Sequence, residues 1–165
     1  MPYPTPQLKY LGQHNANGVY YYSLALHELD SLPRSNWVCL GIANKDFDKD
    51  FFEEFIIFSA SNGLLEFKGQ GAMGELLHDI FDETILEYEY QKDVKTDIMT
   101  TWRNNAPNDL ADNFWGCFYA NVLPEDVQQN QLKVVCIGFD GEDYSDTLKE
   151  LLERINEGWI PPDED

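Results

Sequence analysis

The chain has 165 residues, which is enough for one domain of ordinary size, and 43% of them are apolar, including 4 Trp, 9 Tyr and 10 Phe. This composition excludes a disordered or fibrous chain. The 30 Asp and Glu residues outnumber the 11 Lys and Arg residues, so the formal net charge is −19, which disfavours direct binding to nucleic acid or to an anionic membrane.

The N-terminal third predicts strands followed by an acidic helix. The first elements are an extended, proline-rich lead-in over residues 1–15 and strands over residues 19–26 and 37–43. Phe47, Phe51 and Phe55 then recur at helical spacing among carboxylates. This pattern predicts a short helix with one apolar side.

The middle of the chain predicts a hairpin and then alternating elements. Apolar residues 56–60 and 64–68 flank Ser61-Asn62-Gly63, and Asn-Gly between apolar runs favours a two-stranded hairpin. Further along, periodicity predicts a helix over residues 73–81, a half-exposed strand over 86–90 and a helix over 93–102.

The C-terminal third ends in a predicted helix. Residues 110–115 suit either a helix or a strand, and residues 117–123 and 132–139 predict two strands. Ser145 is the expected cap of a last helix that ends near Gly158, before a solvated acidic tail at 160–165. We therefore expect one α+β domain over residues 1–165, with a mostly antiparallel sheet packed with a few helices.

The cysteines indicate a reducing compartment. Cys39, Cys117 and Cys136 each lie inside an apolar run, and none belongs to a C-x-x-C pair. Such residues are typical of small buried side chains in a cytoplasmic protein. No basic leader followed by an apolar run opens the sequence, so we expect neither a signal peptide nor a membrane segment.

The negative charge is concentrated in two blocks. Residues 46–93 hold 3 basic and 13 acidic residues, and residues 140–165 hold 2 and 10. Carboxylates mixed with aromatic rings are typical of surfaces that bind a basic protein, although solubility alone also explains an acidic surface. The candidate partner-binding residues are Asp46, Asp48, Asp50, Glu53, Glu54, Asp82, Glu83, Glu87, Tyr88, Glu89 and Tyr90.

A glycine-rich segment resembles a nucleotide-binding fingerprint. Gly69-Gln70-Gly71-Ala72-Met73-Gly74 has the G-x-G-x-x-G spacing, between a predicted strand and a predicted helix. Three features argue against this interpretation: Glu66 and Lys68 do not suit a central parallel strand, that strand belongs to the predicted hairpin, and the block is acidic. We therefore expect no cofactor, and treat a nucleotide-binding module as an alternative.

No complete catalytic or metal motif is present in the sequence. Asp46-x-Asp48-x-Asp50 begins like a calcium loop, but Phe51 replaces the turn glycine and Ile57 replaces the last carboxylate. His14, His27 and His78 do not have metal-ligand spacing, and no nucleophile motif is found. The sequence therefore predicts a protein that is not an enzyme.

The stretch Glu87-Tyr88-Glu89-Tyr90 resembles the recognition surfaces of bacterial toxin immunity proteins, and the size and acidity of the chain are similar too. The resemblance implies a cytoplasmic inhibitor that binds a basic, cognate toxin domain, such as a nuclease, without turnover. Two alternatives are a nucleic-acid mimic that blocks a DNA-binding protein and the nucleotide-binding module. Whether the chain forms a homodimer stays open.

Overall fold

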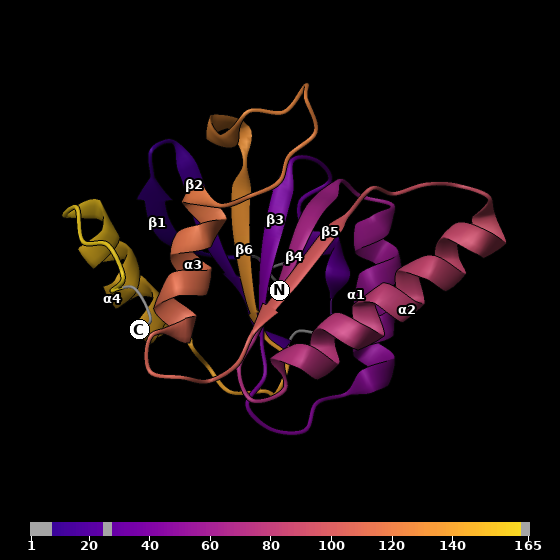
Figure 1. Ribbon diagram of the computed structural model, residues 1–165, viewed down its shortest axis with the longest axis horizontal. Coiled ribbons are helices and arrows are strands. Elements are labelled where there is room, and N and C mark those ends of the chain that lie inside the picture. The colour runs from indigo at the N-terminus through magenta and orange to yellow at the C-terminus, as the bar shows by residue number, and fades with distance from the viewer. Residues whose placement is uncertain (1–7, 25–27, 163–165) are drawn as a thin grey trace, which may run out of the picture.

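The computed structural model describes residues 8–24 and 28–162 (Figure 1). The six strands of this part are β1 (Lys9–His14), β2 (Asn17–Tyr22), β3 (Trp37–Ile42), β4 (Leu64–Gln70), β5 (Met99–Arg103) and β6 (Lys133–Gly138). Its four α-helices are α1 (Lys49–Ala60), α2 (Gly74–Lys92), α3 (Asp109–Tyr119) and α4 (Ser145–Asn156). One domain of the α+β class is confirmed.

The six strands form one mixed sheet in the order β1-β2-β6-β3-β4-β5. Only β1 and β2 pair antiparallel, and the other four pairings are parallel. The expected mostly antiparallel sheet is therefore wrong. Helices join β3 to β4, β4 to β5 and β5 to β6, and such crossovers bring consecutive strands back in the same direction.

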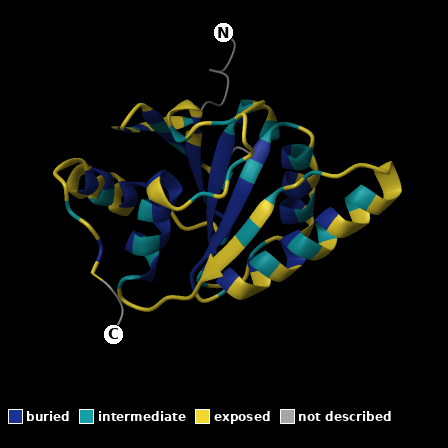
Figure 2. Cartoon of the chain, turned by 45° about the horizontal axis from the view of Figure 1, so that its top comes forward, coloured by how far each residue is buried: buried dark blue, intermediate teal, exposed yellow. Residues whose placement is uncertain are grey.

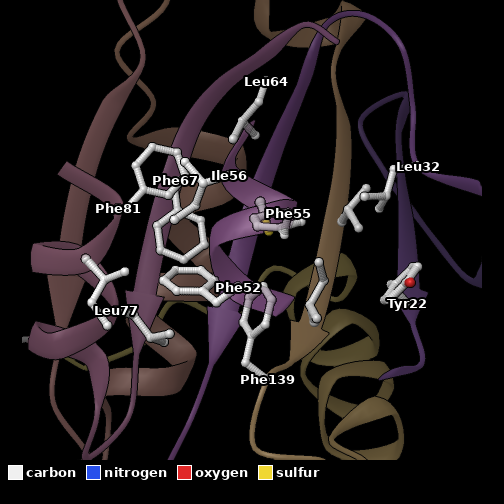
Figure 3. Packing of buried hydrophobic residues seen from close by; sticks show 14 of the residues in the cluster. Tyr22, Leu32, Phe52, Phe55, Ile56, Leu64, Phe67, Leu77, Phe81 and Phe139 are labelled. Atoms are coloured by element: carbon white, nitrogen blue, oxygen red, sulfur yellow. The ribbon is translucent and has the colours of Figure 1, made fainter. Parts of the chain in front are cut away.

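Helices cover both faces of the sheet, as Figure 1 shows. The core beneath α1 and α2 is largely aromatic, and Phe52, Phe67 and Phe139 lie at its centre (Figure 3). On the opposite face, α3 and α4 pack on aliphatic side chains such as Val38, Leu40 and Val134. Both faces are thus buried, which explains why β3 is buried along its whole length.

The predicted hairpin at residues 56–68 is wrong in its first half. Residues 56–60 are the last turns of α1, and the Ser61-Asn62-Gly63 segment connects this helix to β4. Gly63 has a φ of +81°, and a Cβ there would lie 2.4 Å from Cα of Ser35. The glycine therefore ends a helix instead of turning a hairpin.

Two predictions between residues 86 and 102 are also wrong. The expected strand at 86–90 is the second half of α2, and the expected helix at 93–102 is a loop followed by β5. Leu86 and Tyr90 are 66% and 89% exposed. The outer side of this helix carries apolar residues, so these residues alternate with carboxylates in the sequence. The alternation resembles that of a half-buried strand.

The strand expected at residues 117–123 is also wrong. Cys117 and Phe118 belong to α3 and are buried together with Phe114, at the spacing of one helix face. Residues 110–115, which suited either structure, are part of the same helix. The strand expected at 132–139 is confirmed as β6.

The remaining predictions are confirmed with small differences at the termini. The expected strand at 19–26 is β2, which ends at Tyr22, and residues 25–27 lie outside the described part. Within the lead-in at 1–15, residues 9–14 form the edge strand β1, whereas residues 1–7 and, in the expected tail, 163–165 are outside the described part. The last helix is confirmed, but the side chain of Asp143, not Ser145, accepts the bond from its first amide.

Among the residues that the structure describes, no helix combines the length and apolar character that crossing a bilayer requires.

Candidate functional site

At the carboxyl edge of the sheet, the lower edge in Figure 1, the connections that follow neighbouring strands run to opposite faces of the sheet. The connections after β2 and β3 run to the face covered by α1, where Leu24 and Phe52 both pack in the aromatic core. The connection after β6 runs to the other face, where Leu148 of α4 is buried. Where such connections diverge, open α/β sheets leave a crevice that commonly holds a ligand.

A cavity of about 640 Å³ lies at this divergence. Its volume falls within the range of ligand sites, about 300–1,000 Å³. Its lining comes from β1 and β2, from the segments that follow β2, β3 and β6, and from the start of α4: Lys9, Tyr21, Ser23, Leu24, Asp46, Phe47, Asp48, Gly138, Phe139, Asp140, Gly141, Glu142, Asp143 and Ser145. The described lining therefore holds five carboxylates and one ammonium group.

Asp140 fixes the two connections that form the cavity. Its Oδ2 accepts hydrogen bonds from the amide of Asn44 at 2.8 Å and from the hydroxyl of Tyr144 at 2.6 Å. Its Oδ1 accepts from the amide of Glu142 at 3.0 Å. This carboxylate ties the segment after β3 to the segment after β6, so its role is structural.

Tyrosine hydroxyls and helix starts complete the cavity wall. The Tyr21 hydroxyl donates to the carbonyl of Glu142 and accepts from the amide of Tyr144, and burial raises the pKa of Tyr21 to about 12. Asp143 accepts from Ser145, which lowers the pKa of that carboxyl. Asp48 accepts in the same way from the amide of Phe51 at the start of α1. These bonds hold the cavity wall in place and favour the ionised form of Asp143.

The predicted partner-binding residues divide into two groups. Asp46 and Asp48 line the cavity, while Asp50 and Glu54 are exposed and Glu53 half-buried on α1. The remaining six residues lie on α2, which packs beside α1. Tyr88 contacts the far end of α1, where its hydroxyl lies 2.9 Å from that of Ser61. Asp48 and Ser61 flank the two ends of α1, which is about 18 Å long because it has 12 residues.

Three of the six predicted residues on α2 hold the fold together. Asp82 accepts from the hydroxyl of Thr100 at 2.6 Å, and Glu89 accepts from the amide and hydroxyl of Thr96. Tyr88 contacts Ser61, as described above. These side chains are half-buried and already have partners within the protein.

The other three, Glu83, Glu87 and Tyr90, are exposed. They belong to α2, the long helix that carries many exposed residues in Figure 2. They share one exposed side of the helix with two leucines and an aspartate at helical spacing. We call this side the α2 outer face, which consists of Leu76, Asp79, Glu83, Leu86, Glu87 and Tyr90. It combines three apolar side chains with a row of three carboxylates, each four residues from the next.

The glycine-rich segment lies in the setting that the nucleotide fingerprint requires. It follows β4, a central parallel strand, and opens α2, so two of the three objections raised from the sequence are wrong. Glu66 and Lys68 are tolerated because they pair with each other. The glycines allow close packing, since a Cβ on Gly74 would lie 2.3 Å from the carbonyl oxygen of Arg103.

The amides of this segment nevertheless bind the protein itself. Those of Gly71, Met73 and Gly74 donate to backbone carbonyls, and that of Ala72 donates to the side chain of Asn44. A pyrophosphate would need several of these donors. The geometry therefore favours a packing role for the glycines.

Two buried polar groups escaped the sequence analysis. Glu66 and Lys68, both on β4, form an ion pair on the side of the strand that faces α3. From the sequence, their charges argued against a central position for this strand. His14 accepts or donates hydrogen bonds through both ring nitrogens, to Tyr119 of α3 and to Asn156 of α4. No local sequence pattern indicates the second group, because His14 is more than 100 positions from each of its two partners.

Metal binding has no support in the described part of the chain. Within residues 8–24 and 28–162, no three His, Cys, Asp or Glu side chains are placed so that they could hold a metal ion. The carboxylates that imitate a calcium loop, Asp46, Asp48 and Asp50, instead precede and open α1.

The fold and the site define a three-layered α+β protein with an acidic cavity at the carboxyl edge of its sheet. Over residues 19–155 the sequence matches a family described as "Domain of unknown function (DUF7684)". The chain therefore belongs to the DUF7684 family. Comparison with curated proteins and with solved structures finds no match.

Proposed function

We propose that this protein is a non-catalytic inhibitor that binds a basic protein through the α2 outer face, as an immunity protein binds its toxin. The observation that carries this proposal is the exposure of Leu86 and Tyr90 between carboxylates on that face. Exposed apolar side chains at helical spacing can anchor a partner, and the surrounding charges select a basic one.

Further exposed apolar side chains follow α2 in the chain. Val94, Met99 and Trp102 are also exposed, in the loop after α2 and on the edge strand β5. Of the 11 large hydrophobic residues that are exposed in the described part, six therefore lie between positions 76 and 102. Exposed apolar side chains that are frequent in one part of a protein commonly mark a binding surface.

The same features favour a protein partner over nucleic-acid mimicry. A mimic has to reproduce a row of phosphates, which offers no apolar anchors. On the α2 outer face, the exposed side chains of Leu86 and Tyr90 lie beside the carboxylates. A cytoplasmic location is part of the proposal, and the three cysteines support it because all are buried as free thiols.

The test compares the tagged wild-type protein with two double variants in pull-downs from the native host. Leu86→Ala/Tyr90→Ala removes the anchors, and Glu83→Gln/Glu87→Gln removes two charges. The matched control is Glu150→Gln/Glu153→Gln, which makes the same charge change on exposed residues of α4. Captured proteins are identified by mass spectrometry, purified and titrated against each variant.

The proposal expects a basic protein that binds in a 1:1 complex and whose toxic activity the wild type inhibits. Each α2 variant should weaken the complex by about tenfold or more, a loss of about 1.4 kcal/mol, while the α4 variant changes it by less than about twofold. Equal losses for the α2 and α4 variants would contradict the proposal. So would capture of a DNA-binding protein without toxic activity, for which this protein competes with DNA.

A further inference from the structure

The cavity at the carboxyl edge of the sheet has no part in the function proposed above. It lies at the far end of α1 from Tyr88, and its lining includes no residue of the α2 outer face. Its position, between connections that diverge from β6 and from its neighbours β2 and β3, is where sheets of this type hold small ligands. The cavity is therefore a candidate site for a small ligand, separate from the α2 outer face.

We propose that this cavity binds a small aliphatic polyamine. Carboxylates enter the lining from two connections, Asp46 and Asp48 after β3, and Glu142 and Asp143 after β6. A ligand with several ammonium groups can neutralise carboxylates from both connections, which a single positive charge cannot do.

The apolar part of the lining suits the body of such a ligand. Leu24, Phe47 and Phe139 contribute hydrocarbon and aromatic surface between the charged segments. A methylene chain loses its contact with water there, while ammonium groups interact favourably with carboxylates and with aromatic faces.

Other ligand classes fit the lining less well. An anion such as phosphate would meet five carboxylates and only the ammonium group of Lys9, which already donates to Ser145. A bare metal ion lacks a site, because no three suitable side chains converge in the described residues. An organic cation is attracted by the carboxylates, and it does not require three side chains to converge on one atom.

Asp46 is the residue that tests the proposal most directly. It is exposed, and it makes no hydrogen bond or ion pair with any other residue in the part of the chain that the structure describes. By contrast, Asp140 organises the loops, Asp48 and Asp143 accept bonds at helix starts, and Glu142 pairs with Lys45. Reversing the charge of Asp46 therefore alters the cavity and leaves the fold intact.

The experiment titrates spermidine and putrescine into the full-length protein by calorimetry at fixed, near-physiological ionic strength. Asp46→Lys is compared with Glu83→Lys, which makes the same change of net charge on the α2 outer face. Amide chemical shifts of Gly141, Asp143 and Ser145 report whether the ligand occupies the cavity.

The expected result is saturable 1:1 binding that Asp46→Lys weakens by about tenfold or more and Glu83→Lys by less than about twofold. The three amide resonances should shift in the wild type and in Glu83→Lys, and should need about tenfold more ligand to shift in Asp46→Lys. Equal weakening by both variants would mean a diffuse counter-ion atmosphere and would overturn the proposal. Displacement of spermidine by equimolar Mg²⁺ would overturn it too, since the site would then bind a metal ion. Because neither result involves Leu86 or Tyr90, they leave the proposed protein-binding function untouched.

Discussion

Glu66 and Lys68 form an ion pair in the interior of the protein, where their side chains are 1% and 5% exposed. The two residues lie on the same side of β4, which faces the carboxyl end of α3. Glu66 also accepts from the amide of Val122, and Lys68 donates to the carbonyl of Ala120. The pair therefore connects a central strand to the segment that follows α3.

Replacing Lys68 alone should destabilise the protein strongly. Lys68→Met leaves the Glu66 carboxylate buried without its partner, so we expect the free energy of unfolding to fall by about 3–5 kcal/mol. The double variant Glu66→Leu/Lys68→Met removes both charges and should recover most of this loss. Urea denaturation followed by circular dichroism measures both changes.

The control for this pair is Asp30→Asn, which breaks an exposed ion pair with Arg34. We expect its effect to stay below about 1 kcal/mol, because solvent screens surface pairs. A double variant as unstable as Lys68→Met would show that packing, and not the unpaired charge, determines the loss.

Two helical glycines should respond to alanine in opposite ways. At Gly74 a Cβ would collide with the carbonyl oxygen of Arg103, so Gly74→Ala should destabilise the protein by about 2 kcal/mol or more. At Gly116, inside α3, the nearest atom would lie 3.7 Å away. Gly116→Ala should therefore raise the stability by about 0.5–1 kcal/mol, through the higher helix propensity of alanine. Thermal unfolding of the two variants checks the signs, and a stable Gly74→Ala would contradict the packing role of the glycine segment.

Neighbouring glutamates on α2 should differ in their importance for stability. Glu89 accepts two hydrogen bonds from Thr96, at 2.8 Å and 3.2 Å, and so holds the loop between α2 and β5. Glu89→Ala should cost about 1–2 kcal/mol. Glu87 is exposed and contacts only Gln91 of its own helix, so Glu87→Ala should stay within about 0.5 kcal/mol. Hydrogen exchange of the Thr96 amide adds a local measurement, and equal protection in both variants would exclude the proposed contact.

Asp143 should make the stability depend on pH in the acid range. Bonds from Ser145 lower the pKa of this carboxyl, so its ionised form favours the folded state. The contribution is present above the ordinary aspartate pKa of about 4 and is lost as the pH falls through the lowered value. The stability difference between wild type and Asp143→Ala should therefore shrink below pH 4.

Denaturation curves between pH 7 and pH 2 measure this difference. Glu150→Ala removes an exposed carboxylate of α4 and serves as the control for the general charge of the protein. If both variants show the same pH profile, the bond between Asp143 and Ser145 does not control the acid transition.

The sequence by itself determined the parts of the fold that repeat along one element. The buried strands β3 and β6, the phenylalanine side of α1 and the leucine stripe of α4 were all visible as local periodicity. The acidity of the surface was equally accessible, because charge is a sum over residues. These properties need no knowledge of what lies opposite a given side chain.

Only the tertiary structure decided the direction of the strands and the grouping of the polar residues. The Asn-Gly pair at 62–63 suits a hairpin and a helix end equally well, and the distinction depends on the backbone of Ser35 beside Gly63. Glu66 is tolerated in a central strand only because Lys68 and the end of α3 satisfy its charge. Likewise, Asp46 and Asp143 line one cavity because β3 and β6 are adjacent in the sheet, although 97 positions separate them in the chain. Contacts of this kind depend on distance in space, which a linear pattern does not encode.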